Sequence, residues 1–388
     1  MGLSNLIKRS NRLSILLVLL GWLALLTLPL LIVKPNRIAL GDAKTFAQLI
    51  EYSAMWCVCG GLALWSGSQL FLSSQRLRLG VASVSLFILL VGVGQMANAL
   101  AMGSSSIRIS PAAAFWVLFS VYTLSLADGL LNLRLKPLHK LSFLILLTAF
   151  LACLLHTHTL DALAVMREYN QRQSQFWDEF IRHVNLTFGS LFIALVFGLP
   201  LGLACFVLPK IRAATLQVLS LVQTVPSLAL FGLLMAPLSY LAAHYHWVAA
   251  MGVTGIGVAP ALIALVFYGL LPIVANTVVG LNSVSPFVKE SAKGMGLTRM
   301  QILFQIELPL ALPVILTGVR IVLVQTIGLV TVAALIGAGG LGVFVFQGLG
   351  QTATDLVLLG ALPTVFFAFS AAVFLDVLIE YLKKDEQK

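Results

Sequence analysis

The sequence predicts an all-α polytopic membrane protein with about ten transmembrane helices. Hydrophobic residues make up 60% of the chain, only 10% of the residues are charged, and the mean hydropathy is +1.01. In an ordinary soluble domain about a quarter of the residues are charged. The composition therefore excludes a soluble globular protein.

Ten apolar segments are long enough to cross a bilayer, which requires about 20 helical residues. They are residues 13–33, 52–72, 81–101, 112–131, 141–160, 184–208, 214–241, 258–281, 310–336 and 356–382. The first segment follows basic residues, as the apolar region of a signal peptide does. Its 21 residues are too many for that region, and no small-residue cleavage site follows, so we expect a retained membrane span.

The net charge of +10 is distributed in short basic clusters between the apolar segments. If the N-terminus is cytoplasmic, 16 of the 24 Lys and Arg residues lie inside, 7 lie outside, and Arg320 lies within a span. This asymmetry follows the positive-inside rule and predicts that both termini are cytoplasmic. The clusters form no continuous basic stripe, which argues for a lipid membrane and against a nucleic-acid partner.

A long polar stretch separates five spans from five, and it is extracytoplasmic in this topology. We expect an N-terminal membrane region (1–160), a connector (161–183), a C-terminal membrane region (184–382) and a cytoplasmic tail (383–388). The connector could dock a partner or lie along the membrane with Phe176, Trp177 and Phe180 as interfacial anchors. A plain solvated connector is an equally good interpretation.

A short polar hairpin, SPFVKESAKGMGLTRMQILFQIELP, interrupts the apolar sequence on the cytoplasmic side. Ser285 and Pro286 suit the N-cap and first position of a helix. Glu290 precedes Lys293 by three residues, an order that suits the helix dipole. Gly296 suits the residue after the helix, where a positive φ is needed.

A second short helix is expected to follow this glycine elbow. Thr298 and Gln301 form a capping box. Met300, Leu303 and Phe304 would share one face. Pro309 and Pro313 are expected to end this helix and open the next span. Two short helices at a glycine elbow would present a partly apolar surface to another protein.

The hairpin resembles the EAA loop of the membrane subunits of type I binding-protein-dependent ABC importers. The matching residues are Glu290, Ala292, Gly296, Ile306, Leu308 and Pro309. Ser291 departs from the commonest family residue, alanine, but is also small. The resemblance implies that the loop, residues 282–309, docks into a cytoplasmic ATPase. The chain contains no G-x-x-x-x-G-K-[ST] motif, so ATP and Mg would be used by a separate partner, and this chain would have neither catalytic residues nor a cofactor of its own.

Further segments, QTVPSLALFGLL and AALIGAGGLG, resemble the osmoprotectant branch of that family (glycine betaine, choline and carnitine). The resemblance covers residues 184–382 and implies a type I permease core, and the extra N-terminal spans resemble a longer subclass. It also implies a bacterial inner membrane, alternating access, an extracytoplasmic substrate-binding protein and a second permease subunit, identical or different.

Few polar side chains lie in the spans that would line a translocation path. The candidates are Gln223, Thr224, Ser227, Gln325 and Thr326. For any one of them, an ordinary interhelical hydrogen bond is the better interpretation. The ionisable residues within spans are Asp128, Arg320, Asp376 and Glu380. Of these, Arg320 could pair with Asp376.

The stretch GAGGLG contains Gly337, Gly339, Gly340 and Gly342 and formally matches a dinucleotide-binding fingerprint. That fingerprint requires a preceding strand and a βαβ unit, whereas membrane spans flank this stretch. Glycines at an extracytoplasmic helix end favour close helix packing or a bend near an outer gate.

No metal site is expected. The four cysteines all lie in predicted spans, and no C-x-x-C pair occurs. Two H-x-H pairs, His156 with His158 and His244 with His246, have no evident third ligand nearby, so interfacial hydrogen bonding is the better interpretation.

Two other classes of protein deserve consideration. Five spans followed by five of opposite orientation is the pattern of an ion-coupled secondary transporter with an inverted repeat. The two halves, however, show no evident self-similarity, because the first has no counterpart of residues 290–309. A membrane-embedded enzyme would need a clustered nucleophile, base and orienting acid, which the sequence does not offer.

Overall fold

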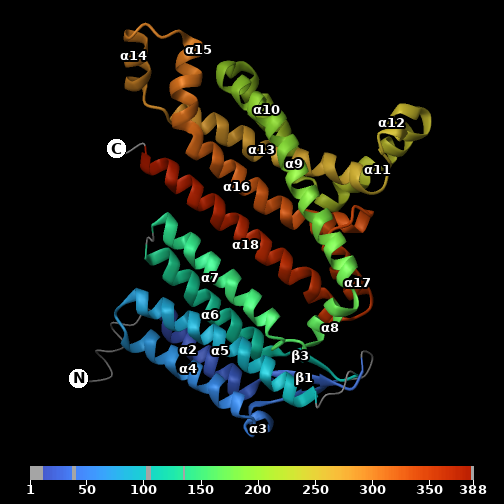
Figure 1. The fold of residues 1–388 in the computed structure, drawn as a ribbon. Coiled ribbons are helices and arrows are strands. Elements are labelled where there is room, and N and C mark those ends of the chain that lie inside the picture. Colours follow the sequence, from blue (N-terminus) through green and yellow to red (C-terminus); the bar gives the residue numbers. More distant parts are fainter. Residues whose placement is uncertain (1–11, 37–40, 102–105, 134–135, 386–388) are drawn as a thin grey trace. The chain divides into compact units, whose positions relative to one another are not determined.

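The computed structural model describes residues 12–36, 41–101, 106–133 and 136–385. The chain divides into two compact units, Met1–Gln171 (unit 1) and Arg172–Lys388 (unit 2), whose elements are labelled in Figure 1. Five basic residues of the predicted charge pattern, Lys8, Arg9, Arg37, Arg134 and Lys388, lie outside the described residues, as do the other two of the last three residues of the predicted tail.

Unit 1 is a bundle of apolar helices. Its helices are α2 (Arg12–Thr27), α3 (Phe46–Leu49), α4 (Ser53–Phe71), α5 (Gln75–Ala101), α6 (Ala113–Asn132), α7 (Pro137–His156) and α8 (Ala164–Gln171). Helix α5 packs against α4 and α6, and α2 packs against α4 and α6 (Figure 1). The fully buried rings of Trp65 and Tyr122 meet edge to face, with centroids 5.4 Å apart, in the core of this bundle.

A small antiparallel sheet was not predicted from the sequence. Its strands are β1 (Leu31–Lys34), β2 (Asp42–Lys44) and β3 (Arg108–Pro111), in the order β2-β1-β3. The predicted span 13–33 was therefore too long at its end, because α2 stops at Thr27 and Leu31 begins a strand. Pro29 accounts for the stop, since proline cannot donate the next helical hydrogen bond.

A buried ion pair joins this sheet to α8. Arg108 Nη1 of β3 lies 2.5 Å from Glu168 Oε1, and the two side chains are 13% and 1% exposed. Burial and then the positive charge of Arg108 lower the pKa of the neighbouring Arg167. Glu168 thus places a negative charge where two guanidinium groups approach each other.

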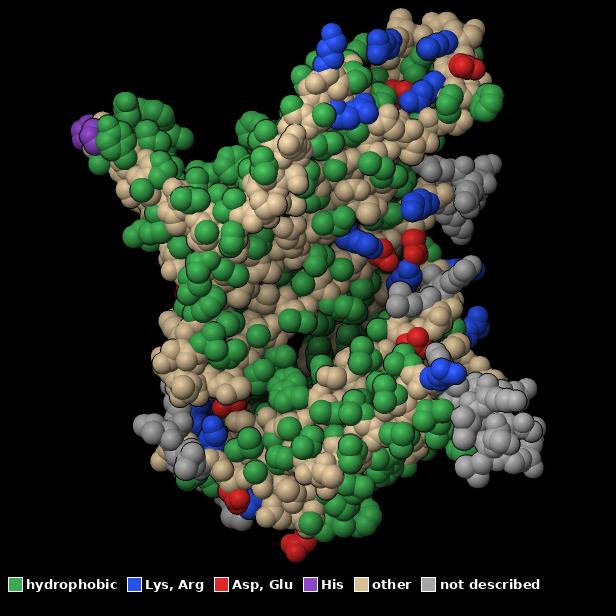
Figure 2. All heavy atoms as spheres, turned by 180° about the vertical axis from the view of Figure 1, so that it is seen from behind, with side chains coloured by type: hydrophobic (Ala, Val, Ile, Leu, Met, Phe, Trp, Pro, Cys, Tyr) green, Lys and Arg blue, Asp and Glu red, His purple; other side chains and the backbone are tan. Residues whose placement is uncertain are grey.

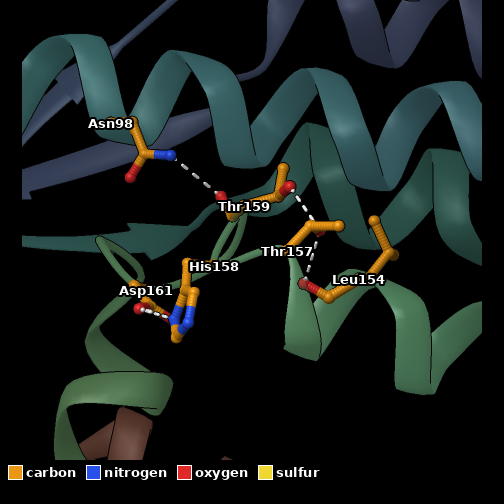
Figure 3. Close-up of polar contacts among 6 residues, drawn as sticks. All are labelled: Asn98, Leu154, Thr157, His158, Thr159 and Asp161. Carbon is orange, nitrogen blue, oxygen red and sulfur yellow. Dashed lines mark hydrogen bonds and ion pairs between the residues drawn. The ribbon is translucent and has the colours of Figure 1, made fainter.

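The turn after α7 is held by exposed polar contacts (Figure 3). Asn98 of α5 donates a hydrogen bond to the Thr159 carbonyl at 3.1 Å. His158 adopts a φ of 57°, which is uncommon for a residue other than glycine. Its Nδ1 lies 2.7 Å from Asp161 Oδ2. His158, the second histidine of the first H-x-H pair, therefore bonds to a residue of its own turn.

Unit 2 contains the remaining helices. They are α9 (Gln173–Val207), α10 (Pro209–Thr224), α11 (Ser227–His244), α12 (His246–Ala250), α13 (Val258–Ser283), α14 (Pro286–Gly294), α15 (Arg299–Ile302), α16 (Leu308–Ala333), α17 (Gly342–Gly350) and α18 (Thr354–Asp385), with a π-helical turn, η1 (Leu303–Glu307), and a 3-10 turn, η2 (Ala334–Ile336). Helix α13 packs against α9, α10, α11 and α16. A Cβ atom on Gly202 of α9 would lie 2.7 Å from the Thr277 Cβ of α13, so glycine permits this close approach.

Eight helices among the described residues are long and apolar enough to cross a membrane, and α2 is a shorter apolar helix. The predicted span 52–72 forms α4, which is not among these eight. Two other predicted spans differ in detail. The segment predicted as 214–241 is broken into α10 and α11 at Val225 and Pro226, since a residue before proline is disfavoured in the helical region. Helix α9 begins at Gln173, well before the predicted residue 184, because part of the polar connector is helical.

The connector residues do not behave alike. Phe176 is buried and stacks on Phe344 of α17, with centroids 6.1 Å apart, so the anchoring role considered for it is wrong. Trp177 is exposed. The wider division of the chain into regions at residues 160, 183 and 382 stays a prediction.

Replacing Glu168 by alanine should destabilise unit 1. The variant Glu168→Ala leaves the Arg108 guanidinium largely buried without its carboxylate, which costs about 3–5 kcal/mol. Thermal unfolding of the detergent-solubilised protein would measure the loss. The control is Asp161→Ala, which removes the exposed pair with His158 and should cost at most about 1 kcal/mol. Equal losses in both variants would contradict a stabilising role for the buried pair.

Candidate functional site

The predicted hairpin is present between α13 and α16. Pro286 occupies the first turn of α14 after Ser285, and Gly296 adopts a φ of 82°. The N–H of Gly296 donates to the Lys293 carbonyl at 2.9 Å and closes the elbow. Thr298 and Gln301 form the predicted capping box at α15. The local geometry that the sequence predicted for the elbow is therefore confirmed.

Burial separates the motif residues into two groups. Ala292 is fully buried, and Leu308 packs against the apolar cluster formed with Leu281 and Ala311. Glu290 and Gly296 are exposed. The first group gives the hairpin its shape, whereas the second group is available to a partner.

Apolar side chains on the hairpin point to solvent. Phe287 is 79% exposed and Met295 is 73% exposed. Met300 and Phe304 are also exposed, but Leu303, predicted on their face, is buried. The Lys and Arg side chains of unit 2 gather at the end that carries α14 and α15, while its sides are largely hydrophobic (Figure 2). This end combines a basic rim with exposed apolar residues, as an interface does.

The predicted stop at Pro309 and Pro313 is wrong. Helix α15 continues through η1 into α16, and the N–H of Leu308 donates to the Leu303 carbonyl, five residues back. Pro309 lies in the first turn of α16, just after the π-helical hydrogen bonds of η1 end. Proline is tolerated in a first turn, because the N–H that it lacks needs no partner within the helix there. The second helix of the hairpin thus runs without a break into the membrane helix α16.

The break between α10 and α11 is held by α13. Gln223 Nε2 donates to the Tyr268 carbonyl at 2.8 Å, and the Tyr268 hydroxyl donates to the Val225 carbonyl at 2.5 Å. A broken helix at membrane depth requires such partners, because bulk water is absent there. Gln223 was a candidate for the translocation path. Its side chain instead forms an interhelical hydrogen bond, the alternative role given for it above.

The other path candidates lie in different environments. Thr224 donates to the Leu221 carbonyl of its own helix, and Thr326 is buried. Ser227 and Gln325 are half-buried. Their role in translocation stays a prediction.

The glycine-rich stretch forms a loop between helices. Gly337, Gly339 and Gly340 have φ values of 80°, 83° and 90°. A Cβ atom on Gly342 would lie 2.0 Å from the Thr331 carbonyl oxygen. Because a helix and not a strand precedes this loop, it does not have the context of a dinucleotide site.

Two residues of α9 that the sequence reading missed hold this loop. The N–H of Gly340 donates to Glu179 Oε2 at 2.6 Å, and the N–H of Leu341 donates to His183 Nδ1 at 3.3 Å. His183 Nε2 in turn lies 3.1 Å from the Ile327 carbonyl of α16. The only available signal was the i, i+4 spacing of Glu179 and His183, which required knowing that α9 begins before residue 184.

The predicted pairing of Arg320 with Asp376 is confirmed. Their side chains form an ion pair between α16 and α18. The two side chains are 37% and 38% exposed, and pairing offsets the cost of placing either charge within a membrane-spanning helix.

One histidine of each H-x-H pair forms a side-chain hydrogen bond. His244 Nδ1 donates to the Tyr240 carbonyl at 2.9 Å, and His158 bonds to Asp161 as described above. Within the described parts of the chain, no group of three or more His, Cys, Asp or Glu residues is placed to hold a metal ion.

Comparison with known proteins gives two family matches. Residues 194–387 match the model of the binding-protein-dependent transport system inner membrane component. Residues 11–166 match the N-terminal domain of the ABC transporter permease YehY.

The chain aligns with most of the length of two curated relatives. The choline transport system permease protein OpuBD of Bacillus subtilis is 36% identical over 222 residues, 57% of this chain and 89% of the relative. The osmoprotectant import permease protein OsmW of Salmonella typhimurium is 38% identical over 202 residues, 52% of this chain and 87% of the relative. An inward-facing structure of the MetNI methionine ABC transporter aligns with 55% of this chain and 98% of its own, with 21% identity and a TM-score of 0.48.

Substitution of Gly342 should destabilise unit 2. In Gly342→Ala the new Cβ would meet the Thr331 backbone, which cannot move without disturbing α16, so we expect a loss of about 1–3 kcal/mol. The control is Gly328→Ala, within α16, where no atom lies within 4 Å and alanine should stabilise the helix by about 0.5–1 kcal/mol. Thermal unfolding of both variants in detergent checks the difference. A Gly342→Ala variant as stable as Gly328→Ala would contradict the close packing of the loop.

Proposed function

Because the chain belongs to the family of inner-membrane components of binding-protein-dependent transport systems, we propose that it imports an osmoprotectant such as glycine betaine. The chain is a multi-pass inner-membrane permease of an ABC importer. Translocation by alternating access and coupling through a cytoplasmic loop are general properties of that family. This membership sets aside the ion-coupled carrier with an inverted repeat.

The observation that carries the assignment is the hairpin at residues 285–309. It presents Phe287, Met295 and Met300 to solvent on short helices whose buried residues join α13 to α16. An exposed apolar surface on a small, well-capped element favours a protein partner. We propose that this partner is a separate cytoplasmic ATPase, which binds ATP and Mg, and that Glu290 and Gly296 lie at the interface.

The other partners follow from the family. An extracytoplasmic binding protein would deliver the solute, and a second permease subunit, identical or different, would complete the pore. With the hairpin in the cytoplasm, the charge pattern of the sequence supports cytoplasmic N- and C-termini.

The solute class is proposed from the relatives and from the chemistry of the path. The named solute of OpuBD, choline, is a quaternary ammonium compound. Such a cation is best selected by an aromatic cage, which we place in the binding protein. Gln223, Thr224, Ser227, Gln325 and Thr326 would offer the permease a weakly binding polar path. The glycine loop at Gly337, Gly339, Gly340 and Gly342 would lie near its outer gate.

Uptake of labelled glycine betaine into vesicles tests the proposed function. The vesicles contain this chain with its ATPase and binding protein, and an ATP supply is compared with an imposed ion gradient alone. We expect uptake only with ATP and all partners. Uptake driven by the gradient without partners would contradict the importer, while ATP hydrolysis stimulated by the binding protein without glycine betaine uptake would refute the solute only.

The double variant Glu290→Ala with Gly296→Pro should lose the ATPase on co-purification. Proline cannot adopt the φ of 82° found at Gly296, so the elbow must change shape. The matched control is Gly252→Pro, at another exposed glycine with a φ of 75° whose N–H also closes a helix end. The control should insert and retain the ATPase. Unchanged co-purification of the double variant would exclude the hairpin as the docking element.

A further inference from the structure

Lys289 points from the hairpin toward the membrane helices. Its Nζ lies 2.7 Å from Glu307 Oε1 and donates to the Leu281 carbonyl at 3.2 Å. The same atom lies 5.2 Å from the centroid of the Phe206 ring, within the range of a cation–π contact. One ammonium group of α14 therefore contacts the cytoplasmic ends of α9 and α13 and the turn that leads into α16.

The Lys289 contacts are sheltered from water. Glu307 is buried, with 7% of its surface exposed, and the Lys289 side chain is 24% exposed. Removing one partner of such a pair leaves the other charge buried without compensation. By contrast, the neighbouring residue Glu290 is exposed. Adjacent residues of α14 thus face two different surroundings.

Glu307 is the last residue of the π-helical turn η1. Such turns are rare and frequently lie at functional sites. The ion pair therefore holds the one point at which the helix running from α15 to α16 departs from regular geometry.

We propose that Lys289, with Glu307 as its partner, is the positioning residue that transmits movement of α14 to the membrane helices. This inference rests on the proposed function, because it requires that α14 receives the ATPase. A push on α14 displaces α9, α13 and α16 together only if the hairpin is attached to them firmly. If the ammonium group is removed, α14 stays attached through its chain connections at both ends and through the buried Ala292. It then loses the contacts of Lys289 with α9, α13 and η1.

The test uses the complete importer in vesicles, with ATP hydrolysis and labelled glycine betaine uptake measured on the same sample. Lys289→Met keeps an apolar side chain against Phe206 but removes the charge. We expect the ATPase to stay bound, while uptake per ATP hydrolysed falls on the order of tenfold, a usual size for energetic coupling between sites. Glu307→Gln should give the same loss, and Lys289→Arg should restore the ratio.

The control is Lys210→Met, which removes an exposed lysine of α10 and should keep the wild-type ratio. Wild-type ratios in Lys289→Met and Glu307→Gln, with the ATPase bound, would overturn the inference alone. Failure of the wild-type chain to bind the ATPase would instead overturn the proposed function. If Lys289→Met does not reach the membrane, Glu307→Gln decides, because it removes the same ion pair with little change of shape. If the importer carries another solute, the readout for each variant becomes the stimulation of ATP hydrolysis by the binding protein, in place of glycine betaine uptake.

Discussion

The satisfaction of backbone hydrogen bonds within a bilayer governs this structure. A helix interruption at membrane depth leaves N–H or C=O groups that water cannot reach. At the break after α10, Tyr268 donates to a free carbonyl, and at the glycine loop Glu179 accepts from a free N–H. At the end of α13, Lys289 donates to the Leu281 carbonyl. In each case a side chain from a different element supplies the missing partner, so each interruption also links two helices.

This constraint explains where polar side chains and irregular backbone are concentrated. Regular membrane helices need no outside partners for their backbone, and their side chains here are mostly apolar. The interruptions are the places where polar groups, glycines with positive φ and a π-helical turn gather. Alternating access requires helices that move as units about such points. The hairpin, the broken α10–α11 pair and the glycine loop are therefore the segments that we propose for coupling and gating.

Local features were predictable from the sequence because short-range chemistry determines them. The capping box at Thr298, the positive φ at Gly296 and most helix positions follow from propensity, spacing and hydropathy. The pairing of Arg320 with Asp376 was also predictable, since an isolated charge within a span is costly. Family membership was predictable for a similar reason, because the motif lies in one continuous stretch of about 20 residues.

Tertiary contacts were not predictable in the same way. Lys289 and Glu307 meet only because the elbow folds α14 back toward the start of α16, and Gln223 meets Tyr268 across two helices. The small sheet escaped notice because β1 continues an apolar segment and one of its two partners, β3, lies far along the chain. The continuity of α15 with α16 depends on a π-helical turn, for which the sequence carries no simple signal.

Site-specific photo-cross-linking tests the central claim, that the hairpin receives the ATPase, most directly. A photoreactive amino acid replaces Phe287, exposed on α14, or Leu138, exposed near the start of α7 and predicted to lie on the same side of the membrane. The account predicts that position 287 cross-links to the ATPase in a transport-competent complex and that position 138 does not. A complex that transports solute but gives no ATPase product at position 287 would contradict it.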